Sequence, residues 1–115
     1  MSLNITPPWD NVSNYMDGRW REPSAPDGQD VVDPATGKVI SHVGVSSESD
    51  VDDAVRAGQE AFETWQSTPV EERIQPLFEL KQLLETHQKE LAEVLVREHG
   101  KTLAEANGEL RRGIE

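Results

Sequence analysis

The stretch that decides the fold is residues 47–65, SESDVDDAVRAGQEAFETW. Its apolar residues recur at steps of three and four, the spacing that places side chains on one face of an α-helix. Ser47, with Asp50 three residues later, predicts a capping box at the helix start, with Asp in place of the usual Glu or Gln. The apolar face consists of Val51, Ala54, Val55, Gly58, Ala61, Phe62 and Trp65.

Two β-hairpins are predicted upstream of this helix. Asp17-Gly18 lies between two short runs of strand formers and supplies the positive-φ pair that a type I′ turn needs. Residues 33–37, Asp-Pro-Ala-Thr-Gly, separate a valine pair from residues 39–44, whose side chains alternate as a strand requires. Residues 1–13 contain two adjacent prolines and little periodicity, so we expect an extended lead-in there.

Three more amphipathic helices are predicted downstream. The first begins at residues 68–71, Thr-Pro-Val-Glu, which combine an N-cap threonine with Pro and Glu at favoured positions. Pro76 should kink this helix or locally unpair its hydrogen bonds. The second covers about 88–99, with Gly100 as its C-terminal cap. The last begins near residue 102 and is still helical at residue 115. The predicted fold class is α+β, mainly α, with two N-terminal hairpins followed by about four amphipathic helices.

The pattern predicts an incomplete fold. The last helix carries no stop signal, and two hairpins with a few helices leave apolar faces without a partner. We therefore expect residues 14–115 to be the opening portion of a larger domain, preceded by the lead-in of residues 1–13.

Composition excludes several classes of function. Asp and Glu number 22 against 11 Lys and Arg, for a net charge of -11. Such a surface repels phosphate backbones and anionic lipid, so we expect neither nucleic-acid nor membrane binding. The acidity fits adaptation to high salt, or an ordinary acidic cytosolic protein. No signal sequence opens the chain, and a cytoplasmic location is expected. Cysteine is absent, which excludes disulfides and a thiol nucleophile from these residues.

No motif predicts a catalytic, cofactor-binding or metal site. The sequence contains neither Gly-x-Gly-x-x-Gly nor a P-loop. His42, His87 and His99 lack metal-ligand spacing. Glutamate pairs on helix surfaces are typical of solvated faces, because catalytic carboxylates need a cleft that shifts their pKa.

Arg111-Arg112 is a cationic pair in an otherwise acidic chain. The planar guanidinium matches a carboxylate in a bidentate way. Glu109 and Glu115 lie at helical neighbour spacing, and spacing alone favours an ion pair within the helix.

Several segments, in order and spacing, resemble the opening of the aldehyde dehydrogenase family. They match its two hairpins, its first helix, the start of its second helix, and the turn and helix that follow. The resemblance covers nearly the whole chain but only the first part of the family's sequence. The segments are 14–20, 33–40, 50–65, 72–73 and 98–106.

Residues 108–115, GELRRGIE, narrow the resemblance to the CoA-acylating methylmalonate-semialdehyde dehydrogenases. There, an arginine at the position of Arg112 helps to hold the substrate carboxylate, so the resemblance implies substrate binding by Arg112 and no matching role for Arg111. It also implies that the fold is part of a cofactor-binding domain, and that the substrate is a small semialdehyde oxidised with NAD or NADP. CoA would accept the acyl group, giving propionyl-CoA or acetyl-CoA.

The resemblance further implies a homo-oligomer whose nucleophilic cysteine and cofactor-binding strands lie beyond residue 115, so the 115 residues alone should be inactive. Two alternatives stay open. One is a hydrolytic semialdehyde dehydrogenase of the succinate or betaine type, which residues 108–113 weakly disfavour. The other is a freestanding acidic helical interaction domain that uses its open apolar faces for self-association.

Overall fold

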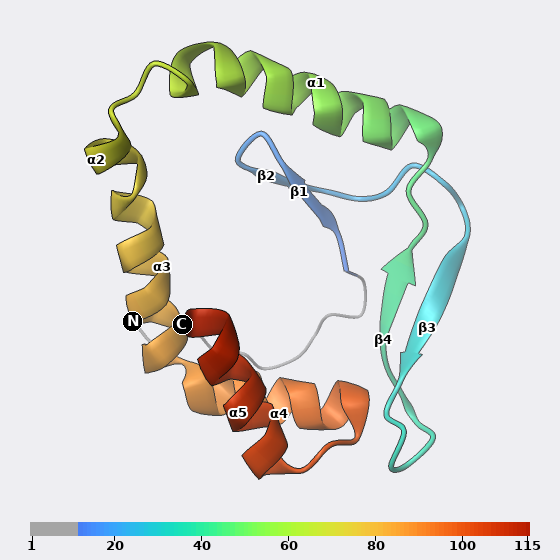
Figure 1. Cartoon of the computed structure of the whole chain (residues 1–115). Helices are drawn as coiled ribbons and strands as arrows, with labels where there is room; N and C mark the ends of the chain where they lie inside the picture. Colours follow the sequence, from blue (N-terminus) through green and yellow to red (C-terminus); the bar gives the residue numbers. More distant parts are fainter. Residues whose placement is uncertain (1–11) are drawn as a thin grey trace. The chain divides into compact units, whose positions relative to one another are not determined.

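The computed structural model describes residues 12–115, so residues 1–11 of the expected lead-in lie outside it. The elements are named in Figure 1. The described chain forms two compact units. The first, called the hairpin unit here, contains residues 12–31 and 39–69; the second, called the helical unit, contains residues 32–38 and 70–115.

The first hairpin of the hairpin unit is formed by β1 (Asn14–Met16) and β2 (Arg19–Arg21), which pair antiparallel. Asp17 and Gly18 have φ angles of 51° and 70°, which confirms the predicted positive-φ turn. Tyr15 lies opposite Trp20, and their ring centroids are 5.0 Å apart in an edge-to-face arrangement. The pairing register is therefore supported by an aromatic contact as well as by the turn.

The second hairpin is formed by β3 (Gly28–Val32) and β4 (Val39–Gly44). In the connecting turn, the Gly37 amide donates to the Asp33 carbonyl at 2.8 Å, and the Asp33 carboxylate accepts from the Ala35 amide at 2.8 Å. Gly37 has a φ of 71°, a left-handed conformation that glycine adopts without steric cost. The predicted turn over residues 33–37 is confirmed.

Helix α1 (Glu48–Trp65) begins with the predicted capping box. The Asp50 amide donates to Ser47 Oγ at 3.2 Å, and the Ser47 amide donates to Asp50 Oδ2 at 2.8 Å. The predicted apolar face is present but uncovered: Val51 is 56% exposed and Phe62 58% exposed.

The second predicted helix is divided in two, as Pro76 indicated. Helix α2 (Val70–Arg73) ends before Pro76, which occupies the first turn of α3 (Gln75–Thr86), where proline's missing N–H costs nothing. Thr68 differs from its predicted N-cap role. Its amide donates to the Trp65 carbonyl and its hydroxyl to the Thr64 carbonyl, at 3.1 and 3.5 Å, so Thr68 completes the end of α1.

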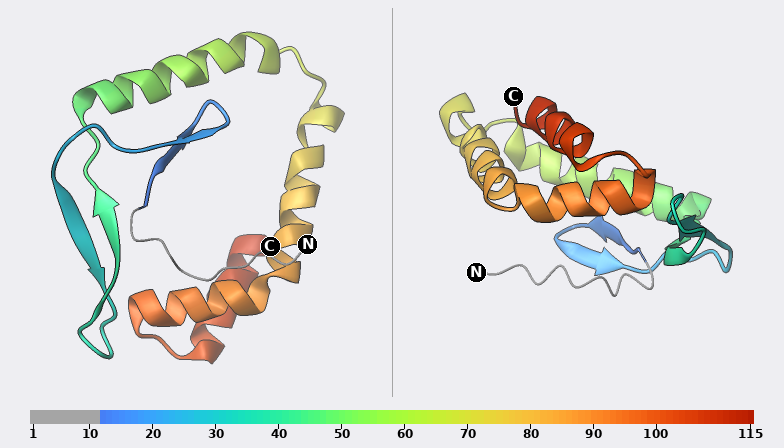
Figure 2. Two further views of the ribbon diagram at one scale, coloured as in Figure 1. Left: turned by 180° about the vertical axis from the view of Figure 1, so that it is seen from behind. Right: turned by 90° about the horizontal axis from the view of Figure 1, so that it is seen from below.

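The centre of the helical unit is the pair α4 (Gln88–His99) and α5 (Leu103–Ile114), which lie side by side in Figures 1 and 2. Gly100 has a φ of 69° and ends α4, as predicted. Ala92 and Ala106 are fully buried, one on each helix, and within residues 12–115 they are the only hydrophobic residues classed as buried. The two small side chains allow the helices to approach closely.

The observed architecture confirms the α+β class, with two small antiparallel sheets followed by helices. None of the helices in residues 12–115 combines the length and hydropathy needed to cross a bilayer.

Candidate functional site

The candidate site lies on α5, whose start is fixed by a second capping box. The Glu105 amide donates to Thr102 Oγ1 at 3.3 Å, and the Thr102 amide donates to Glu105 Oε2 at 2.9 Å. These donors lower the pKa of Glu105, with the backbone amide of Thr102 as the largest cause. Ala106 is fully buried, and α5 packs mainly on α4, so the face of α5 that carries Ala106 is turned inward. The remaining faces of α5 therefore have defined directions.

Four charged residues follow one another at steps of three and four: Lys101 in the turn before α5, and Glu105, Glu109 and Arg112 on α5. Steps of three and four residues place the last three on neighbouring turns. Lys101 Nζ forms an ion pair with Glu109 Oε2. The Lys101 side chain is only 25% exposed, whereas that of Glu109 is 44% exposed.

The Glu109 carboxylate is held in its charged form. Its pKa is lowered first by the hydrogen bond from Lys101 and then by the charge of Lys101. The charges of His99 and Arg112 lower the pKa further, although each contributes less than Lys101. Glu109 therefore has one dominant partner, which comes from the turn before α5 and not from the last turn of the helix.

Arg111 and Arg112 lie in the last turn of α5, where the helix dipole favours cations. Both are exposed, and neither side chain forms a hydrogen bond or ion pair with another residue of the described chain. The ion pair with Glu109 or Glu115 that spacing alone favoured is therefore not formed, and the carboxylate of Glu109 pairs with Lys101 instead. A guanidinium with unused donors can bind a carboxylate with two parallel hydrogen bonds.

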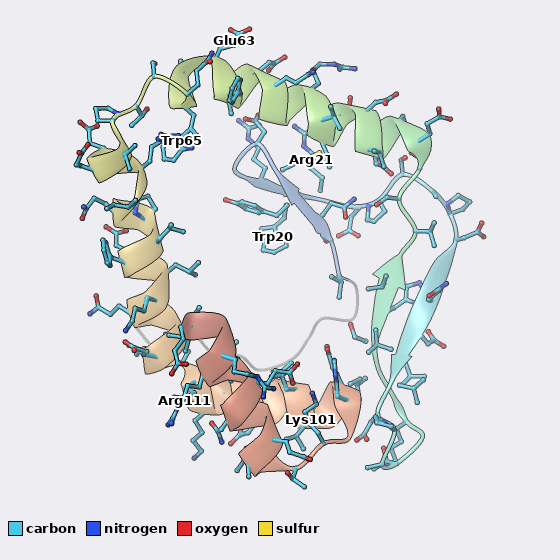
Figure 3. All side chains as sticks on the ribbon, viewed as in Figure 1. Trp20, Arg21, Glu63, Trp65, Lys101 and Arg111 are labelled. Carbon is cyan, nitrogen blue, oxygen red and sulfur yellow. The ribbon has the colours of Figure 1, made fainter. Side chains whose placement is uncertain are left out.

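Figure 3 labels Lys101 in the turn between α4 and α5, and Arg111 on α5. Sequence reasoning identified the arginine pair but missed the Lys101–Glu109 ion pair. The two residues are eight positions apart, outside the i,i+3 and i,i+4 spacings that reveal ion pairs within one helix. The signal available was a lysine directly before residue 102, near which the last helix was predicted to begin.

The histidines occupy separate structural positions. His42 Nδ1 lies 3.1 Å from Asp30 Oδ1 across the second hairpin, and His87 Nδ1 lies 3.1 Å from Glu90 Oε2 at the start of α4. No group of three metal-ligating side chains occurs among residues 12–115.

One hollow of the hairpin unit has a single charged side chain in its lining, and that side chain is already hydrogen-bonded. It has a volume of about 420 Å³ between the first hairpin and α1, and Asp50 is the single carboxylate in its lining. The Asp50 carboxylate accepts hydrogen bonds from Ser24 and Ser47, through both their amides and their hydroxyls. These donors lower its pKa to about 2. The carboxylate therefore joins a loop to the start of α1.

The chemistry of a nicotinamide enzyme needs groups that these residues do not supply. The 115 residues contain no cysteine and no Gly-x-Gly-x-x-Gly loop for a dinucleotide phosphate. A thiol nucleophile and a phosphate cradle would both have to come from outside the chain. What the chain does offer is an exposed guanidinium on a well-anchored helix.

Comparison with known proteins identifies the family of this chain. The profile of the aldehyde dehydrogenase family matches residues 20–115. The malonate-semialdehyde dehydrogenase 2 of Oceanobacillus iheyensis is 47% identical over 105 residues, which cover 91% of this chain and 22% of that protein. The chain thus spans about a fifth of the length of the curated relatives it matches.

Two solved structures show the same backbone arrangement. One, assigned as a methylmalonate-semialdehyde dehydrogenase of Sinorhizobium meliloti in complex with NAD, has a TM-score of 0.86 and 33% identity over 90% of this chain and 21% of that one. The methylmalonate-semialdehyde dehydrogenase of Oceanimonas doudoroffii has a TM-score of 0.81 and 37% identity over 86% of this chain and 20% of that one. The chain therefore belongs to the aldehyde dehydrogenase family.

Proposed function

We propose that this chain is the opening portion of a dehydrogenase that oxidises malonate or methylmalonate semialdehyde, and that Arg112 binds the carboxylate of that substrate. The observation that carries the proposal is the exposed Arg112 guanidinium, which has no partner within the described chain. The similarity to malonate- and methylmalonate-semialdehyde dehydrogenases supports the same reading.

Both proposed substrates carry a carboxylate close to the aldehyde. Binding that carboxylate would orient the aldehyde for oxidation, and the carboxylate itself is later lost as carbon dioxide. A rigid helix suits this task, because the capping box and the buried Ala106 limit the movement of the arginine's backbone. In this proposal Arg112 is a substrate-binding residue, and the reacting groups come from the rest of the protein.

The proposed reaction converts malonate semialdehyde, NAD⁺ and CoA into acetyl-CoA, carbon dioxide and NADH, and methylmalonate semialdehyde into propionyl-CoA. NAD or NADP, when bound, supplies the hydride acceptor. The complex of the Sinorhizobium meliloti structure with NAD supports a nicotinamide cofactor. The proposal also includes a homo-oligomeric, cytoplasmic enzyme, as the family resemblance implies.

The first test is steady-state kinetics of the full-length gene product, with NADH formation as the readout. Malonate semialdehyde is compared with propanal, a neutral aldehyde with the same number of carbons. We expect the wild-type enzyme to prefer the semialdehyde, and Arg112→Ala to lower kcat/KM for it by about ten- to a hundredfold, the range of a charge-assisted hydrogen bond.

Arg111→Ala is the matched control, because it removes the same charge one residue away. An equal loss in both variants would contradict the proposed role of Arg112. The same loss on propanal would also contradict it, because a neutral aldehyde has no carboxylate for the guanidinium to bind.

A separate test distinguishes CoA acylation from hydrolysis. We expect CoA to accelerate turnover and to appear in the product as a thioester. Free acid as the sole product, at a rate that CoA does not change, would favour the hydrolytic alternative and leave the role of Arg112 intact.

A further inference from the structure

The ion pair between Lys101 and Glu109 lies next to the proposed substrate ligand. Glu109 precedes Arg112 by three residues, so the two side chains are neighbours on the surface of α5. A glutamate on the N-terminal side of a cation at this spacing is a favourable helical pair. Even so, Glu109 and Arg112 form no ion pair, and Glu109 pairs with Lys101.

The geometry explains why Glu109 pairs with Lys101 and not with Arg112. Lys101 lies in the turn between Gly100, the cap of α4, and Thr102, the cap of α5, so its backbone is fixed on both sides. Its side chain is three-quarters covered, which strengthens the attraction between its ammonium and the carboxylate. Arg112 is exposed in the last turn of the helix, where water screens its attraction to Glu109.

An arginine that binds a substrate carboxylate must not be occupied by a carboxylate of its own protein. Glu109 and Glu115 are equally near Arg112 in sequence, three residues on either side, and Arg112 already contributes to the lowered pKa of Glu109. If Lys101 were absent, Glu109 would remain charged at neutral pH and would have Arg112 as its nearest cation on α5. The substrate would then have to displace Glu109 before binding.

We propose that Lys101 is a positioning residue that holds Glu109 away from Arg112 and so keeps the guanidinium free for the substrate carboxylate. This inference rests on the proposed function of Arg112 and extends it to the residues that control its availability. It assigns Lys101 no contact with the substrate.

The test uses the full-length enzyme and compares KM and kcat for malonate semialdehyde and propanal. In Lys101→Met we expect KM for malonate semialdehyde to rise about two- to fivefold, the range of an exposed ion pair that the substrate must now break. We expect kcat for the semialdehyde, and both constants for propanal, to stay unchanged. Glu109 would compete only with the substrate carboxylate for Arg112, and propanal has no carboxylate.

Two further variants separate this effect from a change in charge or folding. Lys81→Met removes the same charge and also breaks an exposed ion pair, the one between Lys81 and Glu85 on α3. It should leave KM unchanged. The double variant Lys101→Met with Glu109→Gln should restore the wild-type KM, because the carboxylate that Lys101 held is removed. Lys101→Arg should keep the wild-type KM, because it keeps a cation for Glu109.

The outcomes are distinct. An unchanged KM in Lys101→Met, an equal rise for both aldehydes, or a rise that Glu109→Gln does not reverse would overturn the role of Lys101. If Arg112→Ala itself fails to affect the semialdehyde selectively, the proposed function fails instead, whatever Lys101→Met does.

Discussion

Replacement of Gly100 by alanine tests the account of how α4 ends and α5 begins. Gly100 has a φ of 69°, and a methyl group there would lie 2.8 Å from Pro34 Cγ. The left-handed conformation costs an alanine about 1–2 kcal/mol, and the proline ring must also move. We therefore expect Gly100→Ala to lower the free energy of unfolding by at least about 1 kcal/mol.

Gly108→Ala is the matched control for this substitution. Gly108 lies within α5, and a methyl group there meets nothing within 4 Å. Alanine is favoured over glycine in a helix interior by about 0.8–1 kcal/mol, so this variant should be more stable than the wild type. The two substitutions are chemically identical and are expected to have opposite signs.

The measurement is urea unfolding of the 115-residue chain, followed by circular dichroism at 222 nm. The difference between the two variants should be about 2–3 kcal/mol, which lies well above the error of such a comparison. If Gly100→Ala is as stable as Gly108→Ala, the left-handed cap and its contact with Pro34 do not exist in solution.

Two further predictions concern other elements. Asp50 has its pKa lowered from 3.8 to about 2, so the stability that its charge provides is complete above pH 4 and is lost as the pH falls toward 2. Asp50→Asn should flatten that acid transition in circular dichroism, and an unchanged transition would show that its bonds to Ser24 contribute nothing. Ala106→Leu should destabilise the α4–α5 pair by about 1–3 kcal/mol in the same urea assay, because Ala106 is fully buried. The exposed Ala104→Leu should be nearly neutral, and equal effects would mean that α5 does not pack on α4 as described.

Features encoded in a few adjacent residues could be predicted from the sequence. The positive-φ turn at Asp17-Gly18, the capping box of Ser47 and the left-handed cap at Gly100 each depend on the local backbone and one or two side chains. The break at Pro76 was predicted for the same reason. The structure has five helices where about four were predicted, because this break separates α2 from α3.

Features that join distant residues could not be predicted in this way. The hydrogen bonds of Asp50 to Ser24 span 26 positions, and nothing in either local sequence indicates the other. Thr68 carries a good N-cap signal, yet the tight turn after α1 uses its hydroxyl for Thr64. In both cases the competing partner is set by the path of the chain and not by propensity.

The candidate site also combines a feature that could be predicted from the sequence with one that could not. Arg112 was identified from its resemblance to a family position, and its place on α5 follows from the predicted helix. Glu109 forms no ion pair with Arg112 and pairs instead with Lys101, which lies in the turn before the helix. Spacing within one helix therefore favoured the wrong partner for Glu109.

The most direct test of the central claim is a crystal structure of the full-length protein with methylmalonate, an unreactive acid that matches the proposed substrate. We predict one of its carboxylates at hydrogen-bonding distance, about 2.7–2.9 Å, from the guanidinium of Arg112, with Glu109 still paired to Lys101. A carboxylate bound by other residues, with Arg112 in solvent or paired to Glu109, would contradict the account.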